Sequence, residues 1–205
     1  MVIALVRHGQ TDWNLALRMQ GRTDIPLNAT GREQARTAAR RLADGGWDLV
    51  VSSPLVRARE TAEILADGIR AELGGTDDDL IEEEFGEAEG MLVAAVAERW
   101  PDGDIPGREP VEHVAARGLA ALGRLADAYE GRNVLAVAHG TLIRTTLAAI
   151  SGHDRAHFPK LDNVSSSHVH RVGADWSVLT VGGVEFAIVR AEVEARAAEL
   201  AALAG

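Results

Sequence analysis

Short apolar runs alternate along the chain with segments whose apolar residues recur at helical spacing. Residues 2–6 are apolar throughout, and 47–53 and 133–138 each contain a similar core of Val, Leu or Ala. Short runs of this kind suit strands that are buried on both faces of a parallel sheet. We therefore expect strands over these three ranges, and two more over 164–172 and 176–181.

Helices are predicted where Ala, Leu, Val or Ile return every three or four residues. One helix should follow Thr30, its expected N-cap, because Glu33 completes a capping box, and Gly45-Gly46 should end it. Pro54 suits the first turn of a second helix, which we expect to end at Gly74-Gly75. Further helices are expected near 91–100, 111–129, 141–150 and 189–205.

The order of these elements indicates the fold. Strands that alternate with helices favour a three-layer α/β/α sandwich with a mostly parallel central sheet. We expect one domain over residues 1–205, with a long loop at 9–28 and an acidic, irregular stretch at 76–90. The segment 88–112, broken by Pro and Gly, is expected to form a short lid-like insertion.

Two histidines lie at the ends of predicted strands. Arg7 and His8 directly follow the first apolar run, and His139 and Gly140 directly follow the run at 133–138. In open α/β sheets, ligands bind in the crevice beyond the carboxyl ends of the strands. These residues are therefore candidates for a binding site.

Composition removes several classes of function. The chain of 205 residues has no Cys, which excludes a disulfide framework, a thiol nucleophile and a zinc-thiolate site. A formal net charge of −10 argues against broad binding to nucleic acid or to anionic membranes. No segment is apolar enough to span a bilayer, and the first residues lack the features of a signal peptide, so a cytoplasmic location is expected.

Several motifs occur in a defined order. They are LVRHGQTDWN at 5–14, QGRTDIPLNATGREQA at 20–35, SSPLVRARETA at 52–62, LIEEEFGEAEG at 80–90, VAHG at 137–140 and LDNVS at 161–165. Together they resemble the histidine phosphatase superfamily, which includes the cofactor-dependent phosphoglycerate mutases. The resemblance implies phosphoryl transfer through a phosphohistidine at His8.

The residue types in these motifs suit that chemistry. Phosphoryl transfer spreads negative charge over three oxygens, so catalysis depends on positioning and electrostatic stabilisation. The planar forks of Arg7 and Arg57 can each donate two hydrogen bonds to a phosphate, and His139 can add another donor. The nearby arginines should also keep His8 deprotonated, as a nucleophile requires.

The proton donor is implied to be Glu82, by resemblance. It would protonate the leaving oxygen and later help to deprotonate the attacking water. Its loop is crowded with other carboxylates, at Glu83, Glu84, Glu87 and Glu89, and a solvated acidic loop is the alternative. The pocket lining is expected to include Asn14, which would otherwise only cap a turn, together with Gln20, Gly21 and Gly140.

No metal or other cofactor is expected. His153 and His157, and likewise His168 and His170, could each share a face, but no carboxylate or Cys completes a recognisable ligand set. The expected partner is a small phosphorylated substrate. The Ala- and Glu-rich tail indicates a packed or dimerising helix, which leaves a homodimer open.

Three functions fit the motifs. The first is a phosphomonoester hydrolase acting on a small phosphorylated metabolite, the second a phosphoglycerate mutase, and the third a non-catalytic phosphate-binding regulator. The segment 106–117 resembles the phosphatase branch, and Arg99 and Arg108 are isolated, whereas the mutases carry adjacent arginines. Ala88 stands where many relatives carry Trp, and a reshaped pocket rim is expected there.

Overall fold

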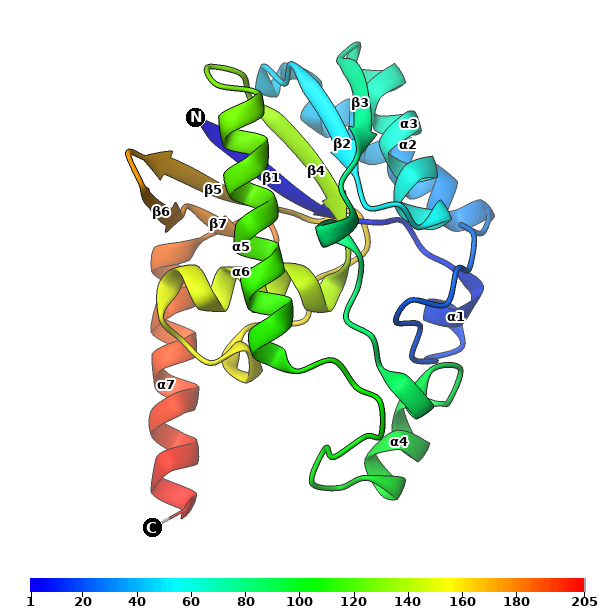
Figure 1. The fold of residues 1–205 in the computed structure, drawn as a ribbon, viewed down its shortest axis with the longest axis vertical. Coiled ribbons are helices and arrows are strands. Elements are labelled where there is room, and N and C mark those ends of the chain that lie inside the picture. Colours follow the sequence, from blue (N-terminus) through cyan, green and yellow to red (C-terminus); the bar gives the residue numbers. More distant parts are fainter. Residues whose placement is uncertain (205) are drawn as a thin grey trace.

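The computed structural model describes residues 1–204 and has a six-stranded sheet at its centre, in the order β3-β2-β4-β1-β5-β6 (Figure 1). The first four of these strands run parallel, while β5 pairs with β1, and β6 with β5, in the antiparallel sense. The sheet is therefore mostly parallel, as predicted. Its strands are β1 (Val2–Arg7), β2 (Leu49–Ser52), β3 (Glu72–Thr76), β4 (Val134–Ala138), β5 (Ser166–Val172) and β6 (Asp175–Val178).

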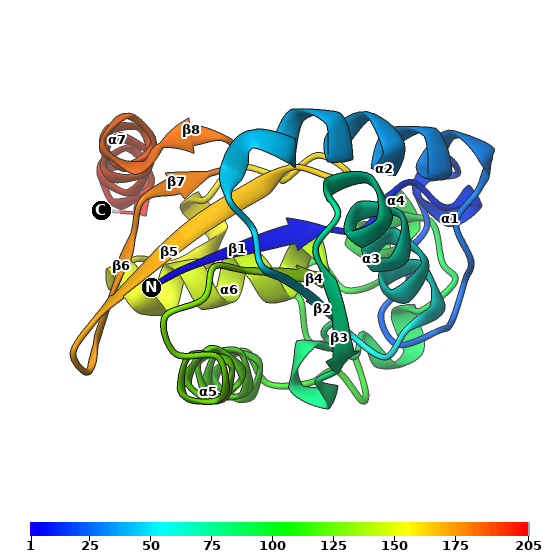
Figure 2. The ribbon, with the colours of Figure 1, turned by 90° about the horizontal axis from the view of Figure 1, so that it is seen from above.

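Helices cover both faces of this sheet and form the outer layers of the expected sandwich. The α-helices are α1 (Asp12–Leu15), α2 (Ala29–Leu42), α3 (Val56–Ile69), α4 (Val93–Arg99), α5 (Val111–Ala128), α6 (Gly140–Ser151) and α7 (Phe186–Ala204). Viewed from above, α2 and α3 lie on one side of the central strands, and α5 and α6 lie on the other (Figure 2). A short ladder of β7 (Thr180–Val181) and β8 (Val184–Glu185) precedes α7.

Strand β1 shows how the sequence builds the two interfaces. Successive side chains of a strand point to opposite faces, so its apolar run serves both layers. Ala4 and Val6 pack in the cluster that includes α2 and α3, while Ile3 and Leu5 pack in the cluster that includes α5 and α6. This double burial explains why the run has no polar residue before Arg7.

Two helix boundaries differ from the prediction. The N-cap of α2 is Asn28 and not Thr30, because the Asn28 side chain accepts the N–H of Gly31 at 2.8 Å. Glu33 therefore completes no capping box and forms an exposed ion pair with Arg36 instead. Helix α3 begins at Val56, two residues after the expected Pro54.

The prediction was also wrong about the stretch that follows α3. This helix ends at Ile69, where Arg70 adopts the left-handed conformation, and not at Gly74-Gly75. The two glycines instead lie inside β3, which pairs with β2 at the edge of the sheet. Glycine weakens a strand, and a glycine pair after a helical pattern usually marks the end of the helix, so the sequence alone does not indicate a strand here.

The segment after Glu84 forms a small lobe with its own apolar cluster. Phe85, Ala88, Val96 and Ile105 are buried together, and Met19, Met91 and Trp100 pack against them. Ala88 is completely buried in this cluster and is not among the residues that line the pocket described below. Short 3₁₀ helices η2 (Asp78–Leu80) and η3 (Gly86–Ala88) precede α4, and η4 (Arg155–His157) follows α6.

Helix α7 lies beside the sheet and projects beyond it (Figure 1). It starts three residues before the expected 189, and Gly205, the last residue of the predicted helix, lies outside the described residues. None of the helices described in this chain is long and apolar enough to cross a membrane.

Candidate active site

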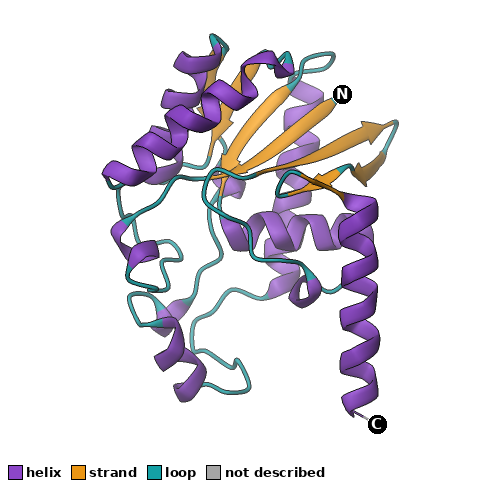
Figure 3. Ribbon diagram, turned by 180° about the vertical axis from the view of Figure 1, so that it is seen from behind, coloured by secondary structure: helices purple, strands orange, loops and turns teal. Residues whose placement is uncertain are grey.

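A pocket of about 440 Å³ opens beyond the carboxyl ends of the central strands. Figure 3 shows that the long loops gather on this side of the sheet, together with α4. The parallel strands β1 and β4 are neighbours, with Arg7 opposite Ala138 in their register. The next residues, His8 and His139, therefore emerge side by side, and their ring centroids are 5.2 Å apart.

His8 is held as a neutral imidazole. Its Nδ1 lies 2.7 Å from the carbonyl oxygen of Gly9, which can only accept, so the proton is on Nδ1 and the lone pair on Nε2. Burial lowers the pKa of His8 well below its usual value, and the positive charges of Arg57 and Arg7 lower it further. The ring is nearly buried, yet it lines the pocket, as a nucleophile must.

Arg7 and Arg57 bring two guanidinium groups to the same pocket. Arg57 is completely buried and donates to the carbonyl oxygens of Thr23 at 2.9 Å and Gly21 at 2.7 Å. Arg7 donates to the carbonyl oxygen of Leu161. Burial lowers the pKa of Arg7 and lowers that of Arg57 to about 10, so both remain cations near neutral pH.

His139 lies behind His8 and does not itself line the pocket. Its ring is completely buried, and its Nε2 forms a 2.8 Å hydrogen bond with the hydroxyl of Ser53. The buried Nδ1 has no hydrogen-bond partner within residues 1–204. Burial and the neighbouring Arg57 lower the pKa of His139, so its ring is also neutral.

Glu82 lies in the pocket, and its carboxyl group contacts the first turn of α6. Its Oε1 accepts the N–H groups of Leu142 and Glu83, both at 2.9 Å, and its Oε2 accepts that of Thr141 at 3.2 Å. These hydrogen bonds favour the carboxylate, but burial outweighs them and raises the pKa of Glu82. A buried carboxyl with a raised pKa can hold a proton and donate it, as a general acid must.

The other carboxylates of this loop are engaged elsewhere. Glu83 binds Arg108 and Arg155, Glu84 pairs with Arg22, and Glu87 lies 3.5 Å from Arg99. Glu89 accepts the backbone N–H groups of Arg22 and Thr23. Of the five crowded carboxylates, Glu82 alone lines the pocket, which agrees with its predicted place.

The remaining predicted lining residues are also brought together. Asn14, Gln20, Gly21 and Gly140 all line the pocket. Asn14 also completes a capping box with Thr11, so the turn-capping alternative describes a second contact of the same side chain. Gly21 has a φ of +55°, a conformation that glycine adopts without strain.

Sequence reasoning missed several residues of the pocket. Asn163, from the LDNVS motif, donates to the carbonyl oxygen of His8 at 2.9 Å and so holds the backbone behind the ring. The motif carries part of the family resemblance, but its residue types alone indicate no role for Asn163. Three basic side chains, Arg18, Arg144 and Lys160, also line the pocket, and they come from segments that no motif marked as functional.

Neither histidine pair gains the further ligands that a metal site needs. Within the described part of the chain, no three His, Asp or Glu side chains are grouped so that they could hold a metal ion. His168 is half-buried, with its ring edge-on to Trp47, and burial lowers its pKa. His153 faces Glu194 of α7 at 3.9 Å.

A neutral buried histidine beside two arginines and a carboxyl whose pKa is raised by burial is suited to phosphoryl transfer through a phosphohistidine. The fold and this site define the class of protein as an α/β phosphotransfer enzyme. The family model of the histidine phosphatase superfamily (branch 1) matches residues 3–183. The chain belongs to this superfamily, and it is a phosphatase.

Known relatives agree that the chain belongs to this superfamily. An uncharacterized phosphatase, PhoE of Bacillus subtilis, is 40% identical over 177 residues, which cover 86% of this chain and 91% of the relative. A probable phosphoglycerate mutase, GpmB of Proteus mirabilis, is 37% identical over 73% of this chain and 74% of its own length. A mycobacterial glucosyl-3-phosphoglycerate phosphatase, solved with VO3, has a TM-score of 0.79 and 31% identity over 88% of this chain and 98% of that protein.

Proposed function

We propose that this enzyme hydrolyses small phosphomonoesters with His8 as the nucleophile that takes up the phosphoryl group. The observation that carries the proposal is the His8 ring, which is neutral, has its lone pair on Nε2 and lies in a pocket with Arg7 and Arg57. Family membership supports the phosphohistidine route, because the superfamily uses that intermediate. A non-catalytic phosphate-binding role would need the two arginines but not a neutral histidine with its lone pair on Nε2.

The first half-reaction phosphorylates the enzyme. Arg7 and Arg57 bind the oxygens of the substrate phosphate, and Asn14 and Gln20 supply neutral contacts. His8 Nε2 attacks phosphorus, so that an N–P bond forms while the ester P–O bond breaks. Glu82 gives its proton to the leaving oxygen, and the product departs as an alcohol.

The second half-reaction restores the enzyme. A water molecule attacks the phosphohistidine, the N–P bond breaks, and its electron pair returns to Nε2 of His8. Glu82, now ionised, takes the proton that the water loses. Inorganic phosphate is released, with His8 neutral and Glu82 protonated as at the start. We keep His139 as a proposed further hydrogen-bond donor to the phosphate because its ring adjoins that of His8, although it does not line the pocket in this structure.

We favour hydrolysis over phosphoglycerate mutase activity. A mutase must grip the dephosphorylated intermediate and keep water away from the phosphohistidine. The two arginines of the segment after the acid loop are engaged elsewhere, since Arg99 faces Glu87 and Arg108 binds Glu83, and neither lines the pocket. Phosphatase names among the relatives support this choice, while the GpmB relative keeps the mutase as the alternative.

Phosphorus NMR distinguishes the two activities. The enzyme is incubated with 3-phosphoglycerate and a trace of 2,3-bisphosphoglycerate, and a panel of phosphorylated metabolites is screened in parallel for released phosphate. We expect inorganic phosphate to accumulate without 2-phosphoglycerate. Rapid formation of 2-phosphoglycerate without phosphate release would establish the mutase instead.

Three further expectations belong to this proposal. We place the enzyme in the cytoplasm, where its substrates would be phosphorylated metabolites, and cell fractionation tests this.

The lobe around α4 would act as a lid within a single domain. A homodimer would use α7, whose Ile188 is exposed, and sedimentation of the purified protein tests that association.

A further inference from the structure

The pocket carries far more positive charge than the chain as a whole. The protein has 31 acidic residues against 21 Lys and Arg, and its formal net charge is −10. The pocket reverses this balance, because one carboxylate lines it, that of Glu82, against five basic side chains. These are Arg7, Arg18, Arg57, Arg144 and Lys160.

No carboxylate neutralises these five cations by direct contact within residues 1–204. The four arginines donate instead to neutral backbone carbonyl oxygens: Arg7 to Leu161, Arg18 to Gly90, Arg57 to Gly21 and Thr23, and Arg144 to Arg155 and Phe158. A carbonyl oxygen orients a guanidinium without cancelling its charge. The pocket therefore keeps its charge available for an anionic ligand.

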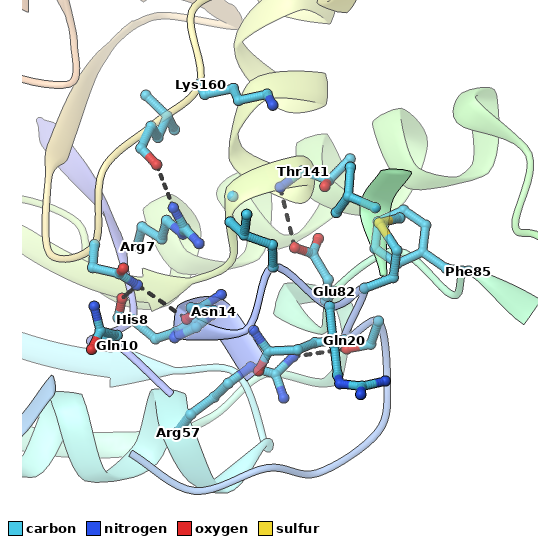
Figure 4. Close-up of a pocket in the computed structure, with 18 of the residues that line it drawn as sticks. Arg7, His8, Gln10, Asn14, Gln20, Arg57, Glu82, Phe85, Thr141 and Lys160 are labelled. Atoms are coloured by element: carbon cyan, nitrogen blue, oxygen red, sulfur yellow. Dashed lines mark hydrogen bonds between the residues drawn. The ribbon is translucent and has the colours of Figure 1, made fainter. Parts of the chain in front are cut away.

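Lys160 is the most distinctive member of this group. It is the only lysine in a chain whose other basic residues are all arginine. Its ammonium group has no hydrogen bond or ion pair to any other described residue. Figure 4 shows Lys160 beyond Arg7, on the side of the pocket away from Arg57.

Arg144 fixes the loop that presents this lysine. Its Nη2 donates to the carbonyl oxygens of Arg155 at 2.8 Å and Phe158 at 2.9 Å, two residues before Lys160. Both side chains line the pocket, and Arg144 anchors the loop that carries Lys160. The Nε of Arg144 is buried without a hydrogen-bond partner within the described chain.

We propose that Lys160 and Arg144 form a second anion-binding subsite, which selects phosphomonoesters that carry another anionic group, either a carboxylate or a second phosphate. The inference rests on the proposed function, in which Arg7 and Arg57 bind the phosphoryl group that is transferred. A phosphate dianion balances two positive charges, and the charges at Lys160, Arg144 and Arg18 then remain without a counterpart. A compact ammonium on a flexible stem suits carboxylates and phosphates of varied geometry.

Kinetics on matched substrates test the subsite. The first pair is 3-phosphoglycerate and glycerol 3-phosphate, which differ by a carboxylate in place of a hydroxymethyl group. The second pair is propane-1,3-diol bisphosphate and its monophosphate. The wild-type enzyme should have a higher kcat/KM for the member that carries the second anionic group in at least one pair, and the pair that shows the preference identifies the second anion.

The variant Lys160→Met removes the charge and keeps the length of the side chain. We expect it to lower the preference for the second anion about fivefold, as for a partly solvated ion pair. Lys160→Arg should restore most of the preference. Arg59→Met, which removes an exposed arginine of α3 outside the pocket, should leave the ratio of the two kcat/KM values unchanged.

Because Lys160 is the only lysine, its acetylation can be followed without ambiguity by peptide mass spectrometry. In a His8→Ala variant, which cannot turn over, saturating 2-phosphoglycolate should slow acetylation of Lys160 more than saturating inorganic phosphate does. Equal protection, together with an unchanged substrate ratio in Lys160→Met, would overturn the subsite. If the wild-type enzyme hydrolyses none of the four esters and no ester of the wider screen, the proposed function itself fails.

Discussion

Glu82 and Glu83 are adjacent in the chain, but their carboxylates lie in different surroundings. Glu82 lines the pocket and accepts hydrogen bonds from the first turn of α6. Glu83 is completely buried, and it binds Nε of Arg108 at 2.7 Å and also the guanidinium of Arg155. One loop thus supplies the proposed acid on one side and, on the other, an anchor for the lobe around α4 and for η4.

The first prediction concerns pH. His8 must be neutral, so its contribution is lost only as the pH falls through its lowered pKa. Glu82 must be protonated, so its contribution is lost as the pH rises through its raised pKa. We therefore expect kcat/KM for an alkyl phosphate to be highest in mildly acid solution and to fall on the alkaline side.

The variant Glu82→Gln tests whether Glu82 causes the fall of kcat/KM on the alkaline side. With alkyl phosphates it should lose about 100-fold in kcat/KM and lose the alkaline dependence, because no group then protonates the leaving oxygen. With p-nitrophenyl phosphate, whose leaving group needs little protonation, the loss should be much smaller. A wild-type rate that climbs steadily into alkaline solution would show that Glu82 is not the acid.

The second prediction concerns the stability that Glu83 supplies. Glu83→Gln leaves Arg108 and Arg155 without their partner, and removing one member of a buried ion pair typically costs about 3 kcal/mol of unfolding free energy. Urea denaturation measures this loss. Glu33→Gln, at an exposed pair with Arg36, is the matched control and should change it by less than about 0.5 kcal/mol. Equal effects of the two variants would contradict the anchoring role.

The third prediction concerns the covalent intermediate. In the wild-type enzyme, rapid quenching during turnover of a radiolabelled phosphomonoester should trap an acid-labile phosphoryl label on His8. His8→Ala should abolish both the label and turnover, with an unchanged circular dichroism spectrum. His113→Ala, at an exposed position of α5, should keep both. Wild-type activity in His8→Ala would refute the assignment of the nucleophile.

The fourth prediction concerns metals and vanadate. Positive charge that a metal would otherwise supply comes here from Arg7 and Arg57. Activity should survive dialysis against EDTA, and vanadate should inhibit by mimicking the transferred phosphoryl group. A solved relative, the mycobacterial glucosyl-3-phosphoglycerate phosphatase, binds VO3. Activity that is lost in EDTA and restored by zinc or magnesium would contradict this prediction.

Periodicity and motif order were sufficient to predict the sheet, the outer helices and the meeting of Arg7, His8, Arg57 and Glu82 at one pocket. These features follow from local patterns, because a buried strand and the residue after it can be recognised within about ten positions. Edge strand β3 was missed because an edge needs little burial, and its Gly74-Gly75 has the appearance of a helix terminus.

Residues from distant, unmarked segments could not be found in this way. Lys160 lies on a loop that Arg144 of α6 holds by two hydrogen bonds, and these contacts join residues that lie outside the recognised motifs. The burial of Ala88 likewise depends on the lobe formed with Met19, a contact between distant parts of the chain. Neither arrangement has a local signature that a single sequence discloses.

Strand β1 is the first element of the chain, yet its two neighbours in the sheet are β4 and β5. During synthesis, the apolar segment 2–6 therefore leaves the ribosome long before residues 134–138 exist to pair with it. Pairings so distant in sequence fold slowly and leave strand edges exposed to aggregation. His8 directly follows β1, so it can reach its final place only after residues 134–138 and 166–172 have been made.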